Sequence, residues 1–196
     1  MNTNTKDLIL ESTLKLVNRE GLYHLNMKKL AKEAGLAIGT AYIYFDSKET
    51  IINELYQKIV RESEVAVFKN FQSERPLKET AIAMMRNLVT CFVSNPDYFS
   101  FIEQYGFSPI LLKESKEKWL GIIDPLTKLI EKGKNKSLLK NLPTVLLLNL
   151  AHGPIIGMLK AFINNQVDLT DEWLQDQLFE ACWKSIASEN IDPKKG

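Results

Sequence analysis

The chain has 196 residues, of which 45% are hydrophobic and 25% charged, a composition typical of a globular protein with one large domain or two small ones. Its 25 lysines and arginines are balanced by 24 acidic residues, so any binding of nucleic acid must come from a local arrangement of charge. The two cysteines, Cys91 and Cys182, lack metal-ligand spacing, which favours buried thiols in a reducing cytosol and leaves a redox-sensing pair as the alternative.

The sequence predicts neither a secretion signal nor a membrane span. The N-terminal stretch MNTNTKDLILEST has an acid beside its lysine and no uninterrupted apolar core, unlike a signal peptide. The most apolar run, Val145 to Leu159, contains Asn149, His152 and Pro154 and is too short to cross a bilayer. We therefore expect a soluble, cytoplasmic protein with no membrane partner.

Nearly every segment has helical periodicity, and no stretch alternates convincingly with period two. The expected fold class is all-α. The first helix is expected from Lys6 to Glu20 with Gly21 as its C-cap, and the second from the N-cap Asn26 to Gly35. Further helices bring the expected total to about nine: Ile38–Phe45, Asp46–Phe71, one from Arg75-Pro76 to Val93, one from Asn95 to Gly106, Leu112–Lys132, Pro143–Asn164 and Thr170–Ser188.

The second and third of these helices are separated by about three residues, which is the helix-turn-helix pattern. On the third helix, Ile38, Ala41 and Phe45 fall on one apolar side. The opposite side carries Gly39, Thr40 and Ile43. A tyrosine, Tyr42 or Tyr44, lies on each flank of these three residues. Such a nearly bare face is unusual for a solvated surface, so something should fit against it.

In a helix-turn-helix the second helix lies in the major groove of DNA. Gly39 would let the backbone approach, Thr40 would hydrogen-bond a base edge, and Ile43 would touch a thymine methyl. Tyrosine hydroxyls and lysines would hold the phosphates on both walls of the groove: Tyr42, Tyr44, Lys28, Lys29 and Lys48. The alternative is a small helical hairpin packed into a core, with the tyrosines covering its neighbours.

The region from Ile9 to Ile52 also resembles the DNA-binding part of the tetracycline-repressor (TetR) family of bacterial transcription regulators. The resemblance lies in Leu-Ala-Lys-Glu-Ala-Gly, then Gly-Thr-Ala-Tyr-Ile-Tyr-Phe, then Ser-Lys-Glu, in the family's spacing. It implies an all-helical homodimer with a three-helix DNA-binding domain at residues 1–47 and a helical ligand-binding and dimerisation domain at residues 48–196. The family's usual operator-contacting positions fall on Lys28, Thr40, Tyr42, Tyr44 and Lys48.

Two positions depart from the family pattern. Ala37 stands where the family usually has a Ser or Thr that caps the recognition helix, so this helix is expected to lack that cap. Ile38 often has a polar counterpart, which limits what it can read on a base; it remains a candidate contact.

The helix expected at Pro143–Asn164 is apolar on nearly all sides, and Gly153 and Gly157 would permit close approach of another helix. We expect the last two helices to form a two-fold four-helix dimer interface, because a DNA module of this kind spans two half-sites. The alternative is that this helix is buried within one subunit.

An aromatic cluster near the middle of the chain is either plain core or the wall of a ligand cavity. For each single aromatic residue, core is the commoner role. As a set with nearby polar groups, the candidates for binding an apolar or aromatic effector are Phe101, Tyr105, Trp119, Asn149 and His152.

No catalytic residues, metal ligands or cofactor-binding motif are recognisable, so we do not expect an enzyme. The sequence favours a ligand-responsive, DNA-binding transcription regulator, a repressor of an operator in double-stranded DNA. The alternative is an α-helical small-molecule binding protein or enzyme whose N-terminal hairpin is merely structural.

Overall fold

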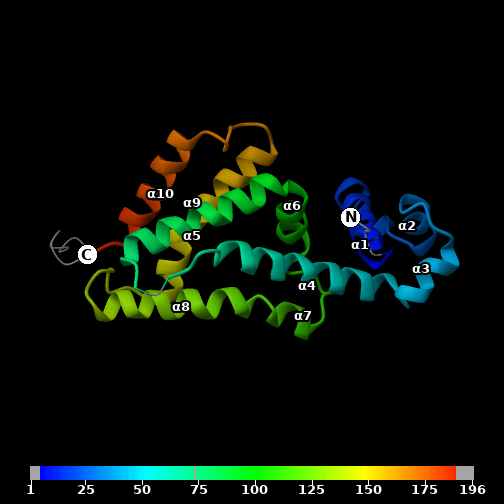
Figure 1. Ribbon diagram of the computed structural model, residues 1–196, viewed down its shortest axis with the longest axis horizontal. Helices are drawn as coiled ribbons and strands as arrows, with labels where there is room; N and C mark the ends of the chain where they lie inside the picture. The colour runs from blue at the N-terminus through cyan, green and yellow to red at the C-terminus, as the bar shows by residue number, and fades with distance from the viewer. Residues whose placement is uncertain (1–4, 73, 189–196) are drawn as a thin grey trace. The chain divides into compact units, whose positions relative to one another are not determined.

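Helices account for every regular element in residues 5–72 and 74–188, which are the residues that the computed structural model of the protein describes. The expectation of an all-α fold is confirmed, with one isolated antiparallel bridge between Leu139 and Ala187. Figure 1 labels the α-helices. In chain order the elements are α1 (Thr5–Glu20), the 3₁₀ helix η1 (Leu22–His24), α2 (Met27–Glu33), α3 (Ile38–Tyr44), α4 (Lys48–Val67), α5 (Leu77–Ser94), α6 (Pro96–Tyr105), α7 (Lys113–Glu117), α8 (Leu120–Asn135), α9 (Thr144–Ile163) and α10 (Glu172–Ile186).

These helices form two compact units. Unit 1 comprises Met1–Glu62 and Asn95–Trp119, and unit 2 comprises Ser63–Ser94 and Leu120–Gly196. Helix α4 contributes to both, because the division falls between Glu62 and Ser63. The predicted boundary between residues 47 and 48 concerns which segments bind DNA and which bind an effector, and it stays a prediction.

The N-terminal helices of unit 1 begin and end where their capping residues stand. Gly21 ends α1 with a φ of 84°, and Gly35 follows α2 with a φ of 66°, a left-handed conformation that costs glycine little. The Leu36 N–H donates to the Ala31 carbonyl at 2.8 Å and so closes the end of α2. At the other end of α2, the Asn26 side chain accepts from the Lys29 N–H at 2.9 Å. The caps predicted at these glycines and at Asn26 are confirmed.

Side-chain amides hold α1 and α4 to the later segments of unit 1. The buried Asn53 on α4 donates to the Ile110 carbonyl at 3.0 Å and accepts from the Leu112 N–H at 2.8 Å. On α1, Asn18 donates to the Asp97 carbonyl at the start of α6, at 2.9 Å. These bonds satisfy backbone groups in irregular segments, which would otherwise cost free energy when removed from water.

The prediction of one continuous helix over Leu112–Lys132 was wrong. The structure has two helices there, α7 and α8. Helix α7 ends in a tight turn, in which Lys118 N–H donates to the Ser115 carbonyl at 3.2 Å and Trp119 N–H to the Lys116 carbonyl at 3.1 Å. Ser115 is fully buried and its hydroxyl accepts from the Gln57 side chain of α4 at 2.9 Å. This contact fixes the short helix within unit 1, and α8 then starts in unit 2.

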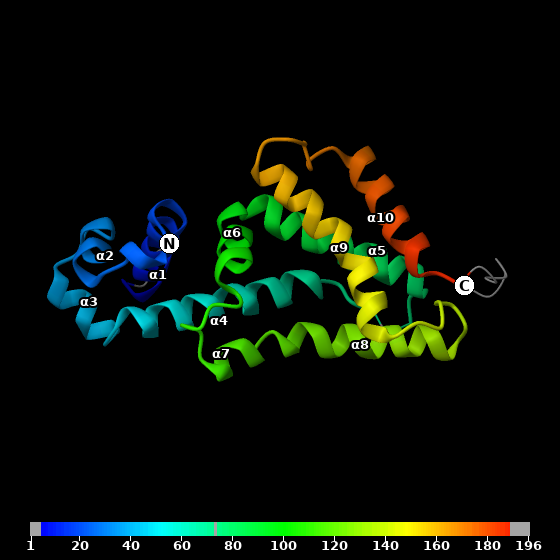
Figure 2. The same cartoon turned by 180° about the vertical axis from the view of Figure 1, so that it is seen from behind.

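Unit 2 packs α5, α8, α9 and α10 around one apolar cluster, and both views show α5 beside α9 and α10 (Figures 1 and 2). Arg86 of α5 lies 5.2 Å from the centre of the Phe179 ring on α10 and also pairs with Asp176. The buried members of the cluster come from three of the helices and the loop before α9: Ile130, Leu139, Leu147, Trp183 and Ile186.

Both cysteines lie in unit 2, and they form no disulfide within the described residues. Cys182 on α10 is buried, and burial raises the pKa of its thiol because a thiolate is poorly solvated there. A raised pKa is typical of a structural thiol, so the prediction of a buried thiol holds for Cys182, whereas Cys91 on α5 is only half-buried.

Helix α9 contains Pro154, which has no N–H to donate to the Leu150 carbonyl one turn earlier. The Ser185 hydroxyl of α10 lies 3.3 Å from that carbonyl and shares its single hydrogen between it and the Cys182 carbonyl at 2.7 Å. Figure 2 shows α9 bending along its length, as expected for a helix with an internal proline. The expectation that this segment is too short to cross a bilayer was wrong, because α9 is long and apolar enough by length and composition alone. Of the residues in its most apolar stretch, 17% are buried.

Candidate nucleic-acid interface

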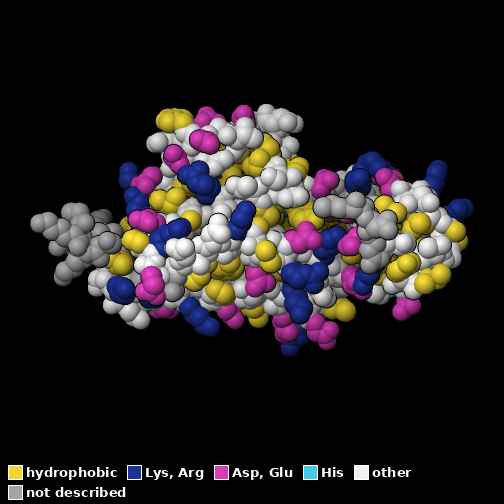
Figure 3. All heavy atoms as spheres, in the orientation of Figure 1, with side chains coloured by type: hydrophobic (Ala, Val, Ile, Leu, Met, Phe, Trp, Pro, Cys, Tyr) yellow, Lys and Arg dark blue, Asp and Glu magenta, His cyan; other side chains and the backbone are white. Residues whose placement is uncertain are grey.

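Helix α3 presents most of its surface to solvent. Its single buried residue is Ala41, and Phe45 is buried directly after its last turn. Ile43 is 80% exposed and Tyr42 50% exposed, although large apolar side chains are normally covered. Figure 3 shows hydrophobic side chains on the molecular surface over α3. An exposed aromatic and aliphatic surface of this kind marks a binding face.

The structure places the remaining candidates on α3 at or near this surface. Gly39 and Tyr44 are exposed and Thr40 is half-buried. A Cβ at Gly39 would meet nothing within 4 Å, so the backbone there is open to an approaching molecule. The assignment of Ile38 to the inward apolar side was wrong, because 46% of its surface is exposed. Ile38 is the first residue of the helix and has no preceding turn to pack it against the core.

Helices α3 and α4 differ in how their first turns are capped. As predicted, Ala37 makes no side-chain cap and leaves the first N–H groups of α3 without that partner. The helix predicted to start at Asp46 begins two residues later, at Lys48. The Ser47 hydroxyl accepts from the Thr50 N–H at 3.1 Å, so Ser47 caps α4 and Lys48 is its first residue. Lys48 therefore lies in the first turn of a long helix, where exposed amides favour anions.

The lysines of the site differ in their ion pairing. Lys29 donates to the Glu20 carboxylate at 2.8 Å, and its ammonium, with Arg19, holds the pKa of Glu20 below its usual range. Arg19 also pairs with Glu33 at 2.8 Å, so these four side chains join α1 to α2. Within residues 5–72 and 74–188, neither Lys28 nor Lys48 has a carboxylate partner. Lys28 and Lys48 therefore have more charge available for a phosphate than Lys29.

The five predicted effector contacts are divided between the two units. In unit 1, Phe101 is fully buried and its ring centre lies 5.5 Å from that of Tyr105. The Tyr105 hydroxyl accepts from the Leu22 N–H at 3.3 Å, and Trp119 is half-buried between α7 and α8. In unit 2, Asn149 and His152 are exposed and bond to carbonyls of their own helix, α9, at 2.8 Å and 2.5 Å.

The sequence did not reveal the contacts that join segments far apart in the chain. Pairing of Lys29 with Glu20, and of Tyr105 with Leu22, depends on how helices pack, and no local pattern shows it. The cap at Ser47 could have been found, because serine is among the residues preferred directly before a helix, where its hydroxyl accepts from an N–H of the first turn.

A short helix held against a preceding helix by a tight turn, with an exposed outer face and lysines beside it, defines a helix-turn-helix module. Comparison with protein families agrees. The family described as "Bacterial regulatory proteins, tetR family" matches residues 9–55, and "Tetracyclin repressor-like, C-terminal domain" matches residues 76–187. The chain therefore belongs to the TetR family of bacterial transcription regulators.

Individual relatives are named as transcriptional regulators. The chain is 33% identical over 107 residues to an uncharacterized HTH-type transcriptional regulator of Haemophilus influenzae, a match that covers 55% of this chain and 57% of that protein. In fold it is similar to a TetR family transcription regulator from Marinobacter aquaeolei VT8, with a TM-score of 0.85, 22% identity and coverage of 94% and 96% of the two chains. A TetR-family transcriptional regulator from Haemophilus influenzae gives a TM-score of 0.77 at 24% identity, over 94% and 97% of the chains.

The uncapped start of α3 gives a stability prediction. Ala37→Thr should supply a hydroxyl to an unpaired N–H of α3 and raise the free energy of unfolding by about 1 kcal/mol, or the Tm by about 2–4 °C. Ala37→Val has the same shape without the hydroxyl and is the matched control. Thermal unfolding followed by circular dichroism measures both, and equal effects of threonine and valine would refute the missing cap.

Proposed function

We propose that the protein is a ligand-responsive repressor that binds operator DNA in the bacterial cytoplasm and is released by a small apolar or aromatic molecule. The observation that carries this proposal is the face of α3, where Tyr42, Ile43 and Tyr44 are exposed beside an open Gly39. Exposing these side chains together to water is unfavourable in a protein without a partner. A helix that enters the major groove needs such a face.

The contacts on DNA are proposed from the position and chemistry of each side chain. Thr40 and Ile43 read base edges, with Gly39 and Ile38 near the groove floor, while Tyr42 and Tyr44 bond to phosphates on its two walls. Lys28 and Lys48 add unpaired charge at helix starts. Lys29 contributes less, because leaving Glu20 for a phosphate exchanges one ion pair for another.

Dimerisation through α9 and α10 is proposed from the surface of α9. Val145 is 67% exposed, and Asn149, His152, Gly153 and Gly157 continue an exposed stripe along the helix. A Cβ at either glycine would meet nothing within 4 Å in the protomer, so the space there is open to a second helix. A second copy would cover this exposed stripe and set two recognition helices on two half-sites.

Effector control is proposed to act through Tyr105. Its ring packs on Phe101, and its hydroxyl holds the backbone between α1 and α2. A ligand that displaces Tyr105 would loosen the helices that present α3. A preference of about 1.4–3 kcal/mol for the loosened state would weaken operator binding roughly tenfold to hundredfold. Of the predicted effector contacts, Phe101, Tyr105 and Trp119 lie in unit 1 and belong to this proposal, whereas Asn149 and His152 lie in unit 2 on the stripe of α9 proposed for dimerisation.

Substitutions on α3 should separate positioning from base reading. Tyr42→Phe should weaken binding to every duplex alike, by about tenfold for a dimer, since each subunit loses a bond to a phosphate. Thr40→Ala should instead reduce the preference between the operator and duplexes altered at one base pair. Fluorescence anisotropy with labelled DNA measures both. Tyr23→Phe, which alters a 91% exposed tyrosine on η1, is the control, and the proposal for α3 is withdrawn if all three behave as the parent.

The unpaired Lys48 should contribute to the salt dependence of binding. Removing one phosphate contact per subunit should reduce the slope of log K against log salt by about two units for the dimer. Lys48→Gln is compared with Lys128→Gln, which removes the same charge from unit 2. Titrations at several salt concentrations give the slopes. Lys48 would not be a phosphate contact if the two variants gave the same slope.

Effector binding should be reported by tryptophan fluorescence and should release DNA. Apolar and aromatic compounds that alter the emission of the parent are then added to the protein–operator complex. We expect at least one to weaken operator affinity tenfold or more, and Tyr105→Phe, which cannot accept from Leu22, to reduce that response. Compounds that bind without affecting the complex would show that the aromatic residues are plain core.

A further inference from the structure

A groove of about 850 Å³ lies in unit 2 between the segment that follows α4, the start of α5, and α8. This volume is in the range of sites that hold small molecules. None of the five predicted effector contacts lines it. The groove is therefore a candidate binding site for a ligand other than the effector proposed above.

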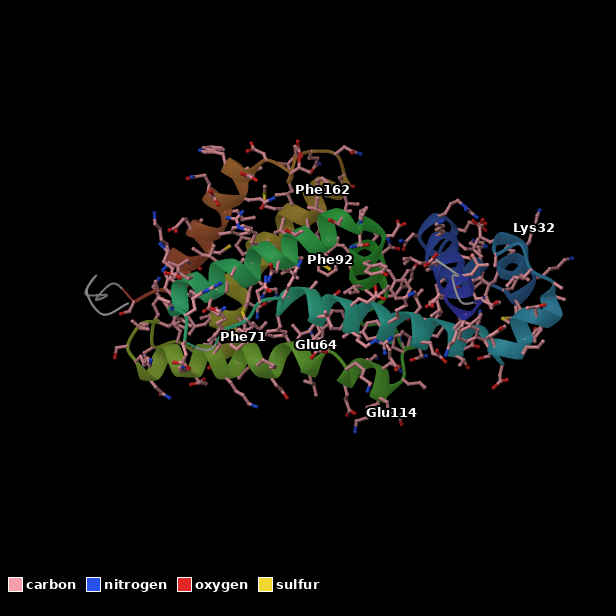
Figure 4. All side chains as sticks on the ribbon, in the orientation of Figure 1. Lys32, Glu64, Phe71, Phe92, Glu114 and Phe162 are labelled. Carbon is pink, nitrogen blue, oxygen red and sulfur yellow. The ribbon has the colours of Figure 1, made fainter. Side chains whose placement is uncertain are left out.

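One side of the groove is apolar and firmly built. Phe71, which Figure 4 shows just beyond α4 and over α8, is 48% exposed and forms part of this side with Leu77 and Leu129. Leu77 also packs on Gly133 of α8 so closely that a Cβ there would lie 2.6 Å from its methyl carbon. Leu77 and Gly133 both line the groove, so this tight contact between α5 and α8 is part of its wall.

The other side is cationic. Four basic side chains line the groove against one acidic residue, Glu74: Arg75, Lys128, Lys132 and Lys136. Figure 3 shows basic side chains, with acidic ones between them, along the edge of the unit that α8 occupies. Such an excess of positive charge around an apolar wall complements a negatively charged ligand.

Among these basic residues, Arg75 indicates most clearly what kind of ligand the groove would bind. It is half-buried, yet its guanidinium has no hydrogen bond or ion pair within residues 5–72 and 74–188. Lys128 and Lys136 likewise have no carboxylate partner in that part of the chain. A planar guanidinium without a partner suits a carboxylate or phosphate that can accept two bonds from it.

We propose that this groove binds an organic anion, with an apolar body against Phe71 and Leu129 and an acidic head on Arg75. Lys128 and Lys136 raise the local concentration of the anion and add to its affinity. The head is a carboxylate, a phosphate or a sulfonate, because each has oxygens that can accept hydrogen bonds from the Arg75 guanidinium. This site stands apart from operator binding, so it can exist whether or not the protein is a repressor.

Three probes with the same apolar tail test the proposal: decanoate, decanol and decyltrimethylammonium. Isothermal titration of the full-length protein, at concentrations below micelle formation, should give decanoate at least tenfold higher affinity than decanol, and no binding of the cation. Inorganic phosphate, which has the charge without the tail, should compete with decanoate only weakly. Equal affinity for decanoate and decanol, or displacement of decanoate by phosphate at equal concentration, would overturn the proposal.

Substitutions locate the binding in this groove rather than elsewhere in the protein. Arg75→Gln should weaken decanoate about tenfold and leave decanol unchanged, since a charged hydrogen bond is lost and the apolar wall is kept. Lys184→Gln, on α10 and away from the groove, is the control for net charge. Lys128→Gln, at an exposed position, should weaken decanoate about threefold and replaces Arg75→Gln if that variant unfolds.

A reporter placed in the wall supplies a second readout. In Phe71→Trp, decanoate should shift the emission of the new tryptophan, and adding Arg75→Gln should move the midpoint of that shift to about tenfold higher concentration. Decanoate binding that is the same in the parent, Arg75→Gln and Lys128→Gln would place the anion at another site and refute the assignment.

Discussion

The central constraint on this fold is that a seven-residue helix must expose most of its surface and still hold its position. An isolated helix of that length is unstable in water, because too few hydrogen bonds offset the cost of starting it. Helix α3 is held by Ala41, by the buried Phe45 at its end and by a turn closed with Gly35. Lys6 of α1 lies 5.4 Å from the Phe45 ring and adds a cation–π contact at the same point. The exposed face depends on these few anchors.

The rest of unit 1 supports the helices that hold α3. Asn18, Asn53 and Tyr105 each bond to backbone groups of another segment, so α1 and α4 are joined to α6 and to the loop after it. Polar side chains perform this linking where a wholly apolar interface would leave loop amides and carbonyls without partners. A change at α6 can therefore reach the DNA-binding helices through a small number of defined bonds, which is the physical basis of the proposed control by an effector.

The residue patterns predicted the local structure well and the tertiary contacts poorly. Caps at Gly21, Asn26 and Gly35 depend on backbone conformation near one residue, and they were found. The break at Trp119 was missed because it depends on Ser115 meeting Gln57 of another helix, and Ile38 was misplaced because its periodicity ignores its position in the first turn. The groove near Arg75 was missed because it also depends on tertiary packing. In the sequence Arg75-Pro76 marks only a chain break, and the lysines that line the groove follow 50 or more residues later.

The shape of the DNA site that the full-length protein selects shows whether two copies of α3 read DNA together. Duplexes enriched from a random pool and footprinted with hydroxyl radicals should show two protected half-sites related by dyad symmetry. Their centres should be separated by about one or a few helical turns, because two copies of α3 read the major groove from one side of the duplex. Enrichment of no sequence, or protection of a single half-site without symmetry, would contradict the claim that paired α3 faces are the DNA-reading surface.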